Sequence, residues 1–501
     1  MSVVIAIDAG TTGVRAIAFD HAGQNVASSY REFTQYFPEP GWVEHDATEI
    51  WESVQTVLGE LSATLGDQHE IVAIGITDQR ETAVVWDRTT GQPVHRAIVW
   101  QDRRTAAFCD RLVAEGHLPL VRERTGLVLD PYFSATKLHW LFTEGGIEPG
   151  THLAFGTVDS WLLWKLTGGT EAEGAVHATD PSNASRTLLF NIRTGEWDPT
   201  LCELFAVPIT MLPTVLPSSG RFGITHESVA GFGAGVPISG IAGDQQAALF
   251  GQACFTPGMT KNTYGTGSFL LMNVGTACPE PVDGLLTTVA WSLGANELTY
   301  AMEGAIFVTG AAVQWLRDGM GLITDAAEIG PLAESVESTD GVVLVPAFTG
   351  LGSPWWDPYA RGTLLGISRG SGRAQIARAV VEAMAFQTRD VVDAMAASSG
   401  TDVAALRVDG GASVMPLLLQ FQADQLGVPV ARPVVQETTA LGAAYLAGLA
   451  EGFWSSLEQI TENWVLDVEV APHTDRRAEA DAAFAQWHRA VERARDWATD
   501  G

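Results

Sequence analysis

The chain has 501 residues, of which 46% are hydrophobic and 18% charged. This composition is typical of a globular protein, and at roughly 100–200 residues per domain the length allows two to four domains or subdomains. Lys and Arg total 29 and Asp and Glu total 59, so the net charge is -30. Such an acidic surface repels phosphate backbones and anionic lipid, and we expect neither nucleic acid nor a membrane surface as a partner.

The cysteines do not indicate a zinc site or a disulfide framework. Cys109, Cys202, Cys254 and Cys278 lie far apart and form no C-x-x-C pair. The first ten residues lack the basic segment and cleavage site of a signal peptide, and no apolar run approaches the ~20 residues needed to cross a bilayer. We therefore expect a soluble, cytoplasmic protein with no membrane insertion.

The first predicted element is a hairpin. Two apolar, β-prone runs, Val3–Asp8 and Val14–Asp20, flank the Gly/Thr turn at 9–13. We expect a third strand near 24–31. The glycines of the turn would let backbone N–H groups approach a phosphate, and Asp8 would lie at the strand end, where a carboxylate can hold Mg²⁺ through water. An ordinary hairpin turn is the alternative.

A helix should follow, because Asp46 can cap its first turn and Glu49 can complete a capping box. Further strands are predicted at 71–76, 83–86 and 97–100. Strands mixed with helices in this way indicate an α/β or mixed α+β architecture. The helix carries apolar residues at helical spacing, namely Ile50, Val54, Val57, Leu58 and Leu61.

A similar pattern returns in the second half. The turn Gly265–Gly267 again joins two β-prone runs, and Leu406–Asp409 runs through a glycine-rich turn into an apolar helix at 417–426. The sequence thus predicts two halves of related build that meet around 240–258 and pack against each other, and a final surface helix from Arg476. Two phosphate-type turns, one from each half, followed by the glycine-rich strand-to-helix turn resemble an actin-like ATPase fold, with nucleotide between duplicated domains.

Two polar clusters are candidates for substrate chemistry. Asp244 at the junction of the halves could take a proton from a substrate hydroxyl during phosphoryl transfer, and its alternative interpretation is a helix N-cap. Arg80 and Glu81 follow a predicted strand and offer both a donor fork and an acceptor, which suits a polyol. A solvated salt pair in a turn is the alternative for this second cluster.

Several long strings resemble the glycerol kinases of the FGGY carbohydrate kinase family, and the resemblance runs from about Val3 to about Trp454. The strings are Pro40–Asp46, Gly75–Thr82, Asp130–Ser134, Phe155–Asp159, Thr179–Leu188, Ile238–Gly251, Asn262–Gly267, Val345–Pro354 and Thr439–Gly448.

The resemblance implies two actin-like, ribonuclease H-like domains, 1–250 with the glycerol site and 251–501 with the adenosine site, and a homodimer or homotetramer. It implies phosphorylation of glycerol to sn-glycerol 3-phosphate with ATP and Mg²⁺. An FGGY kinase for another small polyol or ketose, such as erythritol, dihydroxyacetone or xylulose, is an alternative within the same class. An actin-like ATP-binding switch without a small substrate is the alternative from another class, and it would not need a polyol-binding set.

Site residues also follow from the resemblance, position by position. Asp244 matches the catalytic base and Asp8 the carboxylate near Mg²⁺. The positions that match the glycerol site are Arg80, Glu81, Trp100, Tyr132, Asp244, Gln245 and Phe269. The positions that match the nucleotide site are Thr11, Thr12, Gly13, Arg15, Thr266, Gly310, Gln314, Gly411 and Met415.

Some positions depart from the family pattern. Ala9 stands where glycerol kinases commonly carry Gln, Gly13-Val14 replaces a hydroxyl pair, and Met415 stands where an Asn often lies near the adenine. The loop 230–236 contains only Gly, Phe, Ala and Val, without the Arg that forms a fructose bisphosphate site in some bacterial members. We therefore expect no inhibition by fructose bisphosphate.

Overall fold

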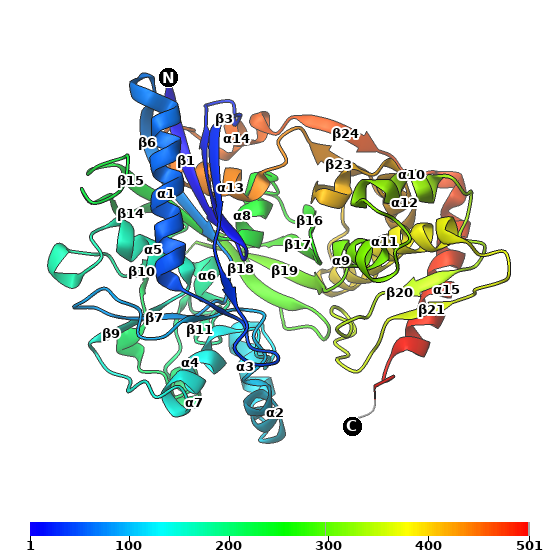
Figure 1. Ribbon diagram of the computed structural model, residues 1–501, viewed down its shortest axis with the longest axis horizontal. Helices are drawn as coiled ribbons and strands as arrows, with labels where there is room; N and C mark the ends of the chain where they lie inside the picture. The colour runs from blue at the N-terminus through cyan, green and yellow to red at the C-terminus, as the bar shows by residue number, and fades with distance from the viewer. Residues whose placement is uncertain (296, 499–501) are drawn as a thin grey trace.

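The computed structural model describes residues 1–295 and 297–498. Two mixed β-sheets form the centres of two halves that lie side by side, the N-terminal half at the left and the C-terminal half at the right of Figure 1. Helices cover both sheets, so the predicted α/β architecture is confirmed. Within the described residues, no helix is both long enough and apolar enough to cross a membrane.

The N-terminal sheet contains the predicted first hairpin. Its strands are, in order across the sheet, β14 (Ser219–Ile224), β15 (Pro237–Gly243), β6 (Glu70–Asp78), β1 (Ser2–Ala9), β2 (Gly13–Phe19) and β3 (Asn25–Glu32). β1 runs antiparallel to β2, as the predicted hairpin requires, and the predicted third strand, β3, runs antiparallel to β2. β6 runs parallel to β1, and β15 runs parallel to β6.

The C-terminal sheet repeats this arrangement. Its strands are, in order, β18 (Leu286–Ser292), β19 (Leu298–Ile306), β17 (Ser268–Gly275), β16 (Thr260–Tyr264), β22 (Leu406–Gly410), β23 (Val430–Pro433) and β24 (Leu466–Val470). The order β3-β2-β1-β6-β15 recurs here as β19-β17-β16-β22-β23, with the same strand directions. The two halves are thus of related build.

The N-terminal sheet is buried on both faces. One face packs on α1 (Ala47–Leu65) and α5 (Val158–Leu166), and the other on α8 (Asp244–Gly251) and α13 (Thr438–Ala450). Val3, Ile5 and Ile7 of β1 point to the first face, while Val4 and Ala6 point to the second. A strand buried on both sides is apolar at every position, which explains the continuous apolar run at the start of the sequence.

Helix α13 joins the two halves, because it belongs to the C-terminal half by sequence and packs on the N-terminal sheet (Figure 1). Its crossing with α8 is made by glycines. A Cβ atom at Gly442 would lie 1.8 Å from the Ala247 carbonyl oxygen, and one at Gly251 would lie 2.0 Å from the Thr438 carbonyl oxygen. Only glycine allows the two backbones to approach this closely.

The remaining elements complete the two halves. α11 (Arg373–Ser399), α12 (Pro416–Leu426) and α15 (Arg477–Ala494) pack within the C-terminal half, the last as the predicted C-terminal helix. The other helices are α2 (Ala106–Ala114), α3 (Leu118–Thr125), α4 (Ser134–Thr143), α6 (Pro181–Ala184), α7 (Pro199–Leu204), α9 (Gly310–Gln314), α10 (Ile329–Glu334) and α14 (Leu457–Asn463). The short strands are β4 (Gln35–Tyr36), β5 (Glu44–His45), β7 (Val84–Asp87), β8 (Ala97–Ile98), β9 (Leu153–Gly156), β10 (Ala178–Thr179), β11 (Phe190–Asn191), β12 (Glu196–Trp197), β13 (Thr214–Val215), β20 (Val343–Val345) and β21 (Thr363–Leu365).

One predicted detail of α1 is wrong. Asp46 caps the helix through the backbone N–H of Thr48 at 2.8 Å, as expected. Glu49, however, does not complete a capping box, because its carboxylate accepts hydrogen bonds from the Tyr36 hydroxyl at 2.5 Å and from the Thr34 backbone N–H at 3.2 Å. The Glu49 carboxylate therefore bonds to the segment between β3 and the end of β4, and not to the backbone at the start of its own helix.

Candidate active site

The ends of three parallel strands bring the predicted substrate residues together. Ala9 of β1 lies opposite Asp78 of β6, and Asp78 lies opposite Gly243 of β15. The residues that follow these three positions therefore meet at one edge of the sheet. In open α/β sheets, ligands bind outside the carboxyl ends of the strands, so this edge is the expected place for a site.

Arg80 is the centre of this group, and its side chain is only 2% exposed. Its Nε lies 3.1 Å from Asp244 Oδ1, and its Nη2 donates to the Tyr132 hydroxyl at 3.3 Å. Its Nη1 also donates to Gln246 Oε1 at 3.3 Å. The interpretation of Arg80 and Glu81 as a solvated salt pair is therefore wrong, since both are buried.

Glu303 of β19 holds Arg80 from the other half of the chain. Its carboxylate accepts hydrogen bonds from Arg80 at 2.5 and 3.2 Å and from Arg186 Nη2 at 2.9 Å. Burial alone would raise the pKa of Glu303, but the charges of Arg186 and Arg80 outweigh it and lower the pKa to about 2. Glu303 is therefore an ionised, fully buried link between the halves.

Arg186 and Glu303 were not identified as site residues from the sequence. Arg186 lies inside the quoted string Thr179–Leu188, and Glu303 is the one charged residue within the apolar run of β19. The sequence did contain one signal for Glu303. A carboxylate inside an otherwise apolar, buried strand needs an opposite charge beside it, which indicates a buried ion pair.

Glu81 is oriented by Arg186 and by its backbone. Arg186 Nε donates to Glu81 Oε1 at 2.6 Å. Glu81 has φ of 63°, a left-handed conformation that costs a non-glycine residue ~1–3 kcal/mol and that clusters at functional sites. Burial raises the pKa of Glu81, although Arg80 and Arg186 oppose the shift.

An aromatic wall lies beside Arg80. The ring centroid of Trp100 is 5.6 Å from that of Tyr132 and 6.5 Å from that of Phe269. The indole N–H of Trp100 donates to Thr11 Oγ1 at 3.0 Å, and this bond connects the wall to the first phosphate-type turn. β8 ends at Ile98, so the strand predicted at 97–100 is shorter than expected and Trp100 lies in the turn that follows.

Asp244 is the first residue of α8, and the helix-cap interpretation is wrong. The cap position is Gly243, and no side chain caps this helix. Asp244 Oδ1 instead accepts a hydrogen bond from the Gln245 backbone N–H at 2.7 Å and faces Arg80. Its Oδ2 has no hydrogen-bond partner among the residues that the structure describes, and the side chain is 32% exposed.

The second phosphate-type turn is built from the C-terminal half. Gly265 N donates to Gly267 O at 2.8 Å, and the Thr266 carbonyl accepts hydrogen bonds from Thr309 and Ala311 at the start of α9. A Cβ atom at Gly310 would lie 2.5 Å from the Gly265 carbonyl oxygen, so only glycine fits there.

The glycine-rich turn after β22 lies beside this second turn, since Tyr264 of β16 pairs with Gly410 of β22. Gly411 is exposed directly after that strand, and Gln314 is exposed at the end of α9. Met415 is different, because its side chain is only 8% exposed and belongs to the apolar core with Leu418 and Ile329.

The first phosphate-type turn contains Thr12 and Gly13, and Asp8 on β1 and Arg15 on β2 flank it. Thr12 is exposed at the tip, and Arg15 forms an ion pair with Glu437 just before α13. A Cβ atom at Gly13 would lie 2.7 Å from both the Arg31 carbonyl oxygen and the Tyr30 hydroxyl, so the fold leaves no room for a side chain there.

Asp8 is a half-buried carboxylate with no side-chain hydrogen bond in the described residues. Burial raises its pKa to about 7, with Arg15 opposing the shift and Asp244 adding to it. Carboxylate oxygens are the ligands that Mg²⁺ prefers, so Asp8 suits that ion chemically. Within 1–295 and 297–498, no group of three or more His, Cys, Asp or Glu side chains is arranged to hold a metal.

Comparison with known proteins identifies the family of the chain. Models of the FGGY family of carbohydrate kinases match residues 3–251 with their N-terminal domain and 260–451 with their C-terminal domain. The chain is 55% identical to a glycerol kinase of Janthinobacterium sp. (strain Marseille), over 99% of both chains, and 56% identical to one of Trichlorobacter lovleyi, over 99% of this chain and 100% of the relative. The structure of Plasmodium falciparum glycerol kinase with ADP matches with a TM-score of 0.92 and 34% identity, over 99% of this chain and 98% of that one. The chain belongs to the FGGY family of carbohydrate kinases.

Proposed function

We propose that the chain phosphorylates glycerol with ATP to give sn-glycerol 3-phosphate, and that Asp244 is the general base. Glycerol kinase activity rests on one observation, the identity of about 55% with glycerol kinases over the full length of both chains. The chain is therefore a phosphotransferase that acts on an alcohol group.

The polyol site supports this substrate. Arg80, Tyr132 and Gln245 offer hydrogen-bond donors and Glu81 offers an acceptor, and we propose that they bind the glycerol hydroxyls. Trp100 and Phe269 supply the apolar wall for the CH faces of the carbon chain. Small-molecule sites combine apolar walls with a few placed polar groups in this way.

Asp244 is placed to act on the reacting hydroxyl. We propose that its Oδ2 takes the proton of a terminal hydroxyl as that oxygen forms a bond to the γ-phosphorus, while the bond from this phosphorus to the β–γ bridging oxygen breaks and ADP leaves. Arg80 orients the carboxylate through Oδ1, which leaves Oδ2 free for the substrate.

The two phosphate-type turns are assigned to the nucleotide. Thr11, Thr12, Gly13 and Arg15 contribute from the region 1–250, and Asp8 would hold Mg²⁺ through water. When bound, Mg²⁺ neutralises charge on the transferring phosphate groups. The region 251–501 contributes the remaining nucleotide positions, Thr266, Gly310, Gln314, Gly411 and Met415.

The cellular setting is also a proposal. We assign the protein to the cytoplasm, and its four cysteines, which form no disulfide, agree with a reducing compartment. A homodimer or homotetramer is proposed as its assembly, and sedimentation would determine which one forms.

A coupled ADP-release assay over glycerol, dihydroxyacetone, erythritol, xylulose and ribulose tests the proposed function. The highest kcat/KM is expected with glycerol. A higher value with another acceptor would make the chain a kinase for that compound. ADP release that does not depend on any acceptor would instead indicate an ATP-binding switch.

A further inference from the structure

Lysine is rare in this chain and occurs only at Lys137, Lys165 and Lys261. Every other basic side chain among the 29 Lys and Arg is arginine. The two residues differ chemically, since arginine presents a planar, always charged fork and lysine a compact ammonium group.

Lys261 lies on β16, three residues before the last residue of that strand, Tyr264, and its side chain is completely buried. Its Nζ donates to Gln245 Oε1 at 2.5 Å and to Thr263 Oγ1 at 3.0 Å. Among the residues that the structure describes, no carboxylate lies within ion-pair distance of this ammonium group.

Charged groups from four elements surround Lys261 at longer range. Asp409 on β22, Asp244 on α8 and Glu303 on β19 favour its charged form, and Arg80 after β6 opposes it. Burial has the largest effect and lowers the pKa of Lys261 to about 8. The ammonium is therefore present at neutral pH and is lost as the pH rises above about 8.

The bond from Lys261 fixes the orientation of the Gln245 amide. Because an ammonium group has only donors, the oxygen of the amide and not its nitrogen must face Lys261. The Nε2 group of Gln245 has no hydrogen-bond partner among the described residues, although the side chain is only 8% exposed. Nε2 is not one of the fully buried side-chain atoms without a partner in the described residues, so this N–H₂ is open to solvent and available to a ligand as a donor.

We infer that Lys261 is a positioning residue, which holds Gln245 with its carbonyl inward and its N–H₂ toward a hydroxyl oxygen of the polyol. The inference rests on the proposed function, because Gln245 is assigned to the glycerol site there. Through its bond to Thr263, Lys261 also connects the polyol site to β16, the strand that leads into the second phosphate-type turn.

Lys261→Met tests the inference, because it keeps an unbranched side chain of similar length and removes the ammonium donors. The KM for glycerol is expected to rise about tenfold, as for one lost hydrogen bond to substrate, with a much smaller change in kcat. Lys165→Met is the matched control. Lys165 lies on α5, away from the site, with its ammonium group over the rings of Trp51 and Trp161. The control variant should leave both KM and kcat unchanged. An unchanged KM in Lys261→Met would overturn the inference.

A double-mutant cycle distinguishes positioning from an independent contact. In a Gln245→Ala background, Lys261→Met is expected to have no further effect on KM. The same fold-increase in both backgrounds would overturn the inference, because Lys261 would then act without Gln245.

Lysine-selective ¹³C NMR provides a test that needs neither Lys261→Met nor turnover. The three lysines should give three ε-carbon resonances. The resonance that the Gln245→Ala substitution shifts in the absence of ligand is assigned to Lys261, because Lys261 bonds to Gln245. Glycerol should shift this resonance in the wild type and not in Gln245→Ala, and no response to bound glycerol would overturn the inference. If glycerol binds and shifts the resonance but the wild type has no kinase activity, the proposed function fails and the positioning role stands.

Discussion

Replacing Glu303 by Gln should destabilise the protein, because it removes the negative charge between Arg80 and Arg186. The carboxylate is fully buried and accepts three hydrogen bonds from these two residues. Lowering its pKa from 4.5 to about 2 corresponds to about 3 kcal/mol in favour of the ionised form. Breaking a buried ion pair by removing one partner costs ~3–5 kcal/mol, which is similar.

The sign of the effect depends on pH. Because the pKa of Glu303 in the folded protein is lower than in the unfolded chain, its stabilisation is complete above about pH 4.5 and is lost as the pH falls toward 2. Thermal unfolding at pH 7 should therefore show a melting temperature several degrees lower for Glu303→Gln. The difference from the wild type should become smaller as the pH is lowered.

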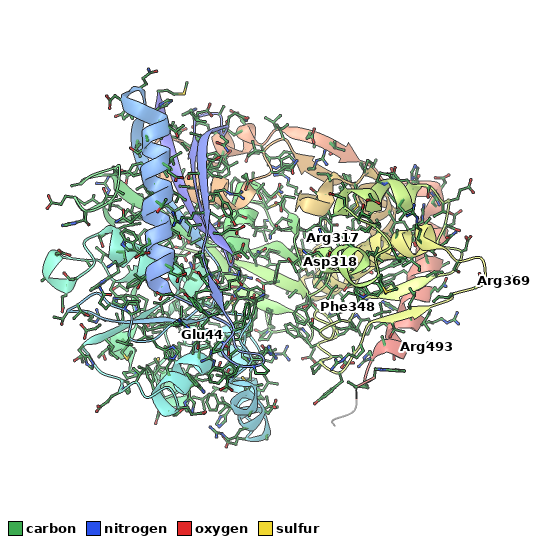
Figure 2. The ribbon with its side chains drawn as sticks, viewed as in Figure 1. Glu44, Arg317, Asp318, Phe348, Arg369 and Arg493 are labelled. Atoms are coloured by element: carbon green, nitrogen blue, oxygen red, sulfur yellow. The ribbon has the colours of Figure 1, made fainter. Side chains whose placement is uncertain are left out.

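A surface pair provides the control. Arg317 and Asp318 form an exposed ion pair on the C-terminal half (Figure 2). Asp318→Asn makes the same chemical change in solvent and should leave the melting temperature unchanged. Glu303→Gln should also raise the KM for glycerol, because Arg80 and Arg186 lose the carboxylate that holds them both, and Arg186 in turn orients Glu81. An unchanged melting temperature and KM at pH 7 would refute the reasoning.

Three further outcomes are expected. Asp244→Asn should lower kcat by on the order of 10²–10⁴ while calorimetry still detects glycerol binding, and a kcat near the wild-type value would exclude Asp244 as the base. Glycerol with a non-hydrolysable ATP analogue should reduce the radius of gyration in solution scattering, because the phosphate-type turns come from both halves; an unchanged radius would contradict closure. Fructose bisphosphate should not inhibit at subsaturating glycerol, since the loop 230–236 offers no cation to its phosphates, and inhibition at micromolar concentration would contradict this.

The hairpins and the repeat were predictable because they depend on local patterns. Alternating and continuous apolar runs around Gly/Thr turns define β1, β2, β16 and β17, and the structure has them where they were expected. The capping box at Glu49 failed because a partner distant in sequence, Tyr36, competes for the same carboxylate. Capping rules consider only neighbouring residues and therefore cannot account for a partner that the fold brings in from elsewhere in the chain.

The site was predictable only in part. Arg80, Glu81 and Asp244 follow strand ends, where sequence patterns place ligand-binding residues. Glu303 lies inside a strand and Arg186 lies two residues after α6, and their role in the site depends on which charges the fold places beside them. Met415 shows the opposite case, because its position matches a nucleotide residue while its side chain packs in the core.

The packing of α13 on the N-terminal sheet has a consequence for biosynthesis. The strands of that sheet and α8 have all been made once Gly251 leaves the ribosome, but the part of the second face that α13 covers, which includes Val4 and Ala6, stays exposed until Ala450 has emerged. At about 5–20 residues per second, this interval lasts roughly 10–40 s. We expect the nascent N-terminal half to expose this apolar surface during that time and to complete its folding only when the second half is nearly finished.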